Sequence, residues 1–76
     1  MSALDDTQEA LALTVNGEAM SVPAATTVAG LLRLLGIKPE QAAVERNGEV
    51  VPRRLHGEQV LAAGDTVEVV TFVGGG

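Results

Sequence analysis

The residues best suited to chemistry stand at the end of the chain, where Gly74, Gly75 and Gly76 follow an apolar segment. We expect the carboxylate of Gly76 to be the terminal group and the glycines to form a flexible tail. Glycine has no Cβ, so it adopts backbone conformations closed to other residues and fits a narrow channel. Fully extended, residues 73–76 reach roughly 13 Å at about 3.3 Å per residue. The alternative is that the glycines are a frayed end or a cloning remnant.

No other part of the sequence offers a catalytic or metal-binding set. There is no cysteine, and His56 is the single histidine. This excludes a thiolate nucleophile, a disulfide, a cysteine zinc site and any Ser/His/Asp or Cys/His arrangement. We therefore expect no metal site, no bound cofactor and no enzyme activity of the chain's own. We interpret His56 as a surface or loop histidine.

Length and charge restrict the remaining function classes. A chain of 76 residues forms one domain, too small for a buried cavity of several hundred Å³. Ten acids against five bases, with one phenylalanine and neither tryptophan nor tyrosine, argue against nucleic-acid binding. No apolar run approaches the roughly 20 residues of a membrane span, and no signal peptide is evident. We expect a cytoplasmic protein that does not bind membranes.

Two Asn-Gly dipeptides, at 16–17 and 47–48, favour two-residue hairpin turns because both residues tolerate positive φ. Apolar residues alternate before the first turn and return after it until Pro23. The second turn is flanked by short strand-like segments. We therefore predict four strands, over about 11–15, 18–22, 42–46 and 49–51. A fifth is predicted from Thr66, after a turn at Ala63-Gly64-Asp65.

One helix is predicted between the hairpins. Thr27 is suited to cap its first turn, and Gly36 is suited to end it in a left-handed conformation. Between them an apolar stripe with helical spacing predicts a buried face, made by Val28, Leu31, Leu32 and Leu35. Gly30 inside the helix suggests the close approach of a strand. The apolar side chains of Val60 and Leu61 are expected to be buried in the core.

The final strand is expected to divide its side chains between two faces. If Val67 and Val69 face the helix, Val70 and Phe72 face outward beside the tail. Exposed apolar residues in one patch often bind a protein partner, so we predict that Val70, Phe72 and Val73 do so. The alternative is that Phe72 folds back over the edge of the core. Arg53 and Arg54 could contact acidic partner residues, although a solvated pair is the simpler interpretation.

The order strand, strand, helix, strand, strand, strand predicts a two-layer α+β domain. We expect the last strand to lie parallel to the first, which gives a β-grasp: a mixed sheet of about five short strands covered by one helix. The predicted organisation is a disordered segment over 1–10, the domain over 11–72 and the flexible tail over 73–76.

The sequence resembles the ThiS-like sulfur carrier proteins of the thiamine pathway, which are ubiquitin-like β-grasp proteins. The resemblance covers residues 11–76. Its marks are Val15-Asn16-Gly17-Glu18, Thr27-Val28-Ala29 with Leu31-Leu32, residues 47–53, Gly64-Asp65, and Phe72 to Gly76. The Gly-Gly ending after this order of elements is the most specific of these marks.

The resemblance implies that a ThiF-like adenylating enzyme uses ATP to convert the Gly76 carboxylate to an acyl-adenylate. Sulfur from a cysteine desulfurase relay then gives a thiocarboxylate, and a ThiG-like thiazole synthase takes that sulfur. Gly74 and Gly75 would be the flexible part of the tail. Two classes of alternative remain open. One is another thiocarboxylate carrier, such as the small subunit of molybdopterin synthase or a carrier for cysteine or tRNA thiolation. The other is a β-grasp interaction module with no covalent role.

Overall fold

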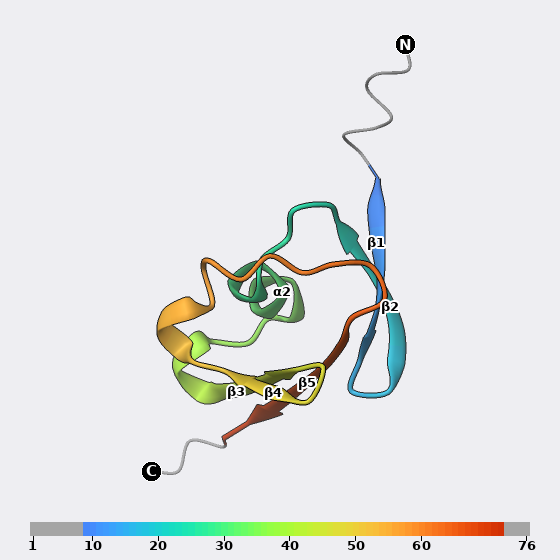
Figure 1. Ribbon diagram of the computed structural model, residues 1–76. Coiled ribbons are helices and arrows are strands. Elements are labelled where there is room, and N and C mark those ends of the chain that lie inside the picture. Colours follow the sequence, from blue (N-terminus) through green and yellow to red (C-terminus); the bar gives the residue numbers. More distant parts are fainter. Residues whose placement is uncertain (1–8, 73–76) are drawn as a thin grey trace.

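Five strands form one mixed sheet in the order β2-β1-β5-β3-β4, so the last strand of the sequence lies at the centre (Figure 1). The structure is a computed structural model that describes residues 9–72. The strands are β1 (Ala10–Val15), β2 (Glu18–Pro23), β3 (Ala42–Arg46), β4 (Glu49–Val51) and β5 (Thr66–Thr71). β1 begins one residue before the expected boundary. β5 pairs parallel with β1 and antiparallel with β3, which confirms the predicted β-grasp.

Both hairpins turn at their Asn-Gly dipeptides, as predicted. In the β1–β2 turn, Asn16 and Gly17 have φ of 50° and 84°. In the β3–β4 turn, Asn47 and Gly48 have φ of 52° and 87°. These angles lie in the left-handed region, which Asn and Gly tolerate best. The two turns therefore set the strand pairing on each side of β5.

The helix α2 (Val28–Leu35) covers one face of the sheet (Figure 1). The Thr27 hydroxyl accepts a hydrogen bond from the Gly30 N–H at 3.0 Å, and Gly36 ends the helix with a φ of 75°. Both caps were predicted. The suggestion that Gly30 admits a strand is wrong, because the atoms nearest to a Cβ built at Gly30 are Thr26 Cγ2 and Thr27 Oγ1, at 3.3 and 3.5 Å. They belong to the segment just before the helix.

The core lies between α2 and the inner face of the sheet. Its buried residues are Leu13, Val15, Val22, Val28, Leu31, Leu32, Ala42, Val44, Val51, Leu61, Val67 and Val69. Leu35 is half-buried and packs against this cluster. Val60 was expected to be buried with Leu61, but it is exposed. It pairs with Thr27 in an isolated β-bridge, which places the adjacent Leu61 in the core instead.

Two short 3₁₀ turns complete the described part of the chain: η1 (Pro39–Gln41) before β3, and η2 (Arg53–Leu55) after β4. Within residues 9–72, no helix is long and apolar enough to cross a membrane.

Candidate functional site

The predicted site depends on β5, the strand that leads to the glycines. β5 lies between β1 and β3; β3 pairs with it from Val67 to Thr71, and β1 pairs with its first two residues. The pairing of β5 with β3 continues one residue beyond both strands. There the Phe72 N–H donates a hydrogen bond to the Gln41 carbonyl at 2.9 Å. The backbone is therefore held as far as Phe72. Val73, Gly74, Gly75 and Gly76 lie outside the described residues.

Asn16 extends the attachment of β5 beyond the end of β1. Its side-chain Oδ1 accepts from the Val69 N–H at 2.7 Å, and its Nδ2 donates to the Val69 carbonyl at 3.1 Å. The parallel register pairs Val15 with Val67, so β1 stops short of Val69. The asparagine amide therefore supplies both hydrogen bonds that a longer β1 would have made to the Val69 backbone.

The side chain of Asn47 forms hydrogen bonds in the same way at the start of β5. Its Oδ1 accepts from the Thr66 N–H at 2.9 Å, and its Nδ2 donates to Asp65 Oδ1 at 3.0 Å. Both Asn-Gly turns thus bind β5 through their side chains as well as reversing the chain. The dipeptides were interpreted only as turns, and sequence spacing gives no sign of this second role.

Asp65 joins the start of β5 to the second hairpin. Its carboxylate accepts from the Ala62 N–H at 2.8 Å and from Arg46 Nε at 2.8 Å, besides the bond from Asn47. Burial by itself would raise the pKa of Asp65. The hydrogen bonds from Ala62, Asn47 and Arg46, with the positive charge of Arg46, outweigh burial and hold the pKa of this carboxyl below its usual value.

Three exposed apolar side chains lie on the face of the sheet away from α2, near the end of β5. They are Val50, Val70 and Phe72, which are 67%, 57% and 52% exposed, and we call them the outer patch. Ala43 of β3 is paired with Val70 and exposed on the same face. The predicted exposure of Val70 and Phe72 is confirmed, and Phe72 does not fold back over the core. Val50 was missed, although the inward position of Val51 requires its neighbour on a strand to face outward.

A hollow of about 220 Å³ lies beside Phe72, at the edge where β3 extends past β4. Arg53 and Pro52 also line it. Arg53 is exposed, and its Nη2 donates to the Glu40 carbonyl at 3.3 Å, joining η2 to η1. Apolar side chains with an exposed cation beside them form a surface suited to contact with another protein.

His56 lies in the turn after η2, which agrees with the prediction of a loop histidine, but it is not on the surface, because only 4% of it is exposed. Its Nε2 lies 3.0 Å from the Val51 carbonyl and donates to it, while its backbone carbonyl accepts from the Ala29 N–H at 2.8 Å. His56 therefore connects β4, through its ring, to the first turn of α2, through its backbone carbonyl. Among residues 9–72, no group of three or more His, Cys, Asp or Glu side chains could hold a metal ion.

The structure holds the backbone of Phe72 in a fixed position beside the exposed apolar side chains of the outer patch. The described residues bring together Val70 and Phe72 of the predicted partner-binding set and add Val50 to them.

A sequence model of the ThiS family matches residues 9–76. The crystal structure of the thiamine biosynthesis protein ThiS from Geobacter metallireducens is similar, with a TM-score of 0.71 and 39% identity. The match covers 87% of this chain and all of that one.

Two thiazole synthases are also similar in sequence. That of Magnetococcus marinus is 52% identical over 62 residues, which is 82% of this chain, and that of Paramagnetospirillum magneticum is 42% identical over 64 residues, which is 84%. The chain spans about a fifth of the length of these relatives, 19% and 20% respectively.

Proposed function

The chain belongs to the ThiS family, and from that premise we propose that it is a sulfur carrier of the thiamine pathway. The carrying group is the carboxylate of Gly76. The protein is then a co-substrate of its partner enzymes and catalyses no reaction alone. Its site of action is the cytoplasm.

The proposed chemistry proceeds in three steps on Gly76. A carboxylate oxygen attacks the α-phosphorus of ATP in an adenylating enzyme, and pyrophosphate leaves. The terminal sulfur of a persulfide supplied by a cysteine desulfurase then attacks the acyl carbon, AMP leaves, and an acyl disulfide forms. A thiol attacks the donor's sulfur of this S–S bond and forms a disulfide with it, so that Gly76 leaves as a thiocarboxylate. A thiazole synthase takes the sulfur, and this partner is supported by the two thiazole synthases that resemble the chain.

The observation that carries this proposal is the anchoring of β5 in the centre of the sheet as far as Phe72. A tail that must reach a buried active site needs a fixed point of departure, because an ordered base reduces the entropy lost on docking. The outer patch beside that point offers the contact surface, with Val70 and Phe72 as its predicted binding residues and Val73 next in sequence.

The test is an intact mass measurement on the protein purified from its own host under conditions that preserve thioacids. We expect a species in which one oxygen is replaced by sulfur, with the change mapped to Gly76. The same measurement shows whether Gly76 is the terminal residue in the host. A variant lacking Gly76 should fold normally and remain unmodified.

The contrary result is a plain carboxylate after incubation with ATP, a sulfur source and the adenylating enzyme of the host. Sulfur delivery by the variant without Gly76 would equally contradict the proposal. Either outcome would favour a non-covalent interaction module that uses the outer patch.

A further inference from the structure

A second hollow lies on the helix side of the molecule. Its volume is about 260 Å³, and the residues that line it are Ala29, Arg33, Gly36, Ile37, Lys38 and Pro39. We call it the α2–η1 hollow. The outer patch is on the opposite face of the sheet, because α2 covers the face that Val67 and Val69 share. The two surfaces are therefore separate.

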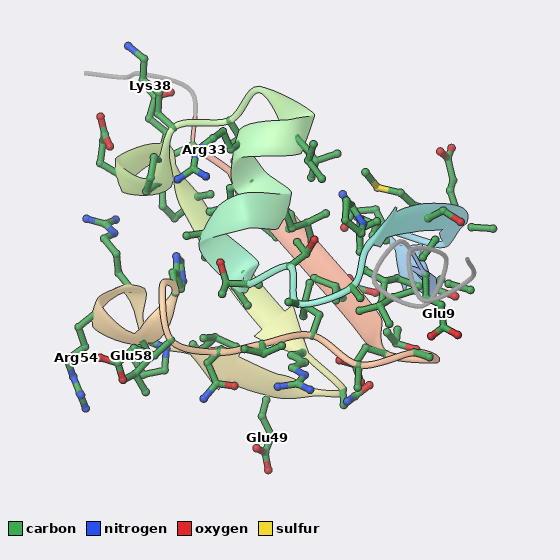
Figure 2. All side chains as sticks on the ribbon, turned by 90° about the horizontal axis from the view of Figure 1, so that it is seen from above. Glu9, Arg33, Lys38, Glu49, Arg54 and Glu58 are labelled. Carbon is green, nitrogen blue, oxygen red and sulfur yellow. The ribbon has the colours of Figure 1, made fainter. Side chains whose placement is uncertain are left out.

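Two cations stand at this hollow with an apolar floor between them. Arg33 and Lys38 are exposed and lie on the same side of α2, next to η1 (Figure 2). Within residues 9–72 the one ion pair joins Arg46 to Asp65, so neither cation has a carboxylate within 4.0 Å there. The positive charge of Arg33, in the last turn of α2, also interacts favourably with the negative end of the helix macrodipole. That interaction does not account for the position of Lys38 or for the apolar residues that line the hollow.

The local charge differs in sign from that of the whole chain, whose net charge is −5. No acid stands between Glu18 and Glu40 in the sequence, and Glu40 is outside the residues that line the hollow. An acidic protein would be repelled by most of this molecule and attracted here. Such a local reversal steers a partner to one orientation.

We propose that the α2–η1 hollow docks an acidic segment of a partner protein, with an aliphatic side chain of that segment seated between Arg33 and Lys38. The inference rests on the proposed function, because a carrier that is loaded by one enzyme and emptied by another must bind both. With the outer patch and this hollow on opposite faces, the chain has two surfaces with which to do so. The partner's carboxylates face the two cations, and its aliphatic side chain covers Ala29 and Ile37.

The experiment measures binding of the full chain to two probes, the adenylating enzyme and the thiazole synthase of the same host, each purified separately. The variants are Arg33→Glu, Lys38→Glu and the double substitution. Arg54→Glu is the matched control for each single substitution: it makes the same charge change on η2, away from the hollow (Figure 2). We expect the double variant to weaken binding to at least one enzyme by ~10-fold or more and to reduce its salt dependence. Arg54→Glu should leave both unchanged.

A second variant tests the apolar part and guards against misfolding. Ala29→Leu fills the hollow without changing charge, and it should weaken binding to the same enzyme. Unfolding curves of all variants show whether the fold is kept. If the double variant is unstable, the affinity of Ala29→Leu for the two enzymes tests the proposal instead.

Three outcomes would overturn the inference. One is unchanged affinity of the folded double variant for both enzymes, and the second is equal weakening by Arg54→Glu. The third is a wild-type dimer that the double variant dissociates, since the hollow would then bind a second copy. If wild-type protein binds neither enzyme, the proposed function fails first, and the two failures are thereby distinguished.

Discussion

At the residue scale, side-chain amides and one carboxylate decide how β5 is held. Asn16, Asn47 and Asp65 accept hydrogen bonds from backbone N–H groups at the ends of the strand pairing, and those made by Asn16 and Asp65 are partly buried. An unpaired buried donor costs about 1–3 kcal/mol, more than a typical exposed contact contributes. Two predictions belong to this scale.

Replacing Asp65 by Asn should lower the free energy of unfolding at neutral pH by about 1–3 kcal/mol, because one acceptor oxygen becomes an NH₂ group that faces donors. Since folding lowers the pKa of the Asp65 carboxyl below its usual value, its contribution is fully present above the unfolded-state pKa and is lost as the pH falls through the folded-state pKa. Urea unfolding between neutral and acidic pH measures both effects. Glu58→Gln, at an exposed side chain, should change little, and an equal loss in both variants would contradict the role of Asp65.

Replacing Asn16 by Ala should speed hydrogen exchange at the Val69 amide, because that N–H loses its 2.7 Å acceptor. Ala is also strained at the φ of 50° found here, whereas Gly is not. Asn16→Gly therefore separates the two causes: it should still expose the Val69 amide to exchange while relieving the backbone cost. Normal protection of Val69 in Asn16→Gly would show that the side-chain bonds are unimportant.

At the element scale, α2 stabilises the domain by burying one stripe of side chains against the sheet. Val28, Leu31 and Leu32 are fully buried, while Leu34 on the same helix is 56% exposed. The capping bonds define where the helix begins and ends, but eight residues are too few for stability without packing. The contribution of the helix is therefore concentrated in its inner face.

This concentration predicts a large difference between two leucines of the same helix. Leu31→Ala should lower the free energy of unfolding by about 2–5 kcal/mol, because it leaves a cavity in the core. Leu34→Ala, the same chemical change at an exposed position, should stay within about 0.5 kcal/mol. Denaturant unfolding of both variants measures the difference, and comparable losses would mean that the helix does not pack as described.

At the scale of the whole molecule, the sheet separates two surfaces. The helix face supplies the core and carries the α2–η1 hollow, and the opposite face carries the outer patch beside the end of β5. Substitutions in the outer patch should therefore change binding without changing stability.

Phe72→Ala provides that test. We expect it to reduce kcat/KM of adenylation by ~10-fold or more with an unchanged free energy of unfolding, because a half-exposed aromatic side chain contributes to an interface and little to this core. Leu34→Ala, on the helix, is the control and should be adenylated normally. Steady-state pyrophosphate release measures the rate. A Phe72→Ala protein that is unfolded, or one that is adenylated at the normal rate, would contradict the assignment of Phe72 to a docking surface.

Short stretches of sequence were enough to predict the elements whose causes are local. The Asn-Gly turns, the Thr27 and Gly36 caps and the apolar stripe of α2 follow from the conformations and periodicities that a few neighbouring residues favour. The outward position of Val70 and Phe72 follows from strand alternation in the same way. These features were sufficient to predict the β-grasp topology and the family resemblance.

The three-dimensional structure was needed to show which residues from different segments contact one another. Asn16 binds Val69, 53 residues away, His56 is buried against β4, and Val50 joins Val70 and Phe72 on the outer face. Arg33 and Lys38 become neighbours at a hollow because η1 folds back beside the end of α2. Each of these contacts depends on the strand order and on the path of a connecting segment, and the local sequence pattern predicts neither the order nor the path. The physical reason is that many chain paths can satisfy the same hydrogen bonds and bury the same side chains. The partner of a residue is therefore known only when the path of the chain is known.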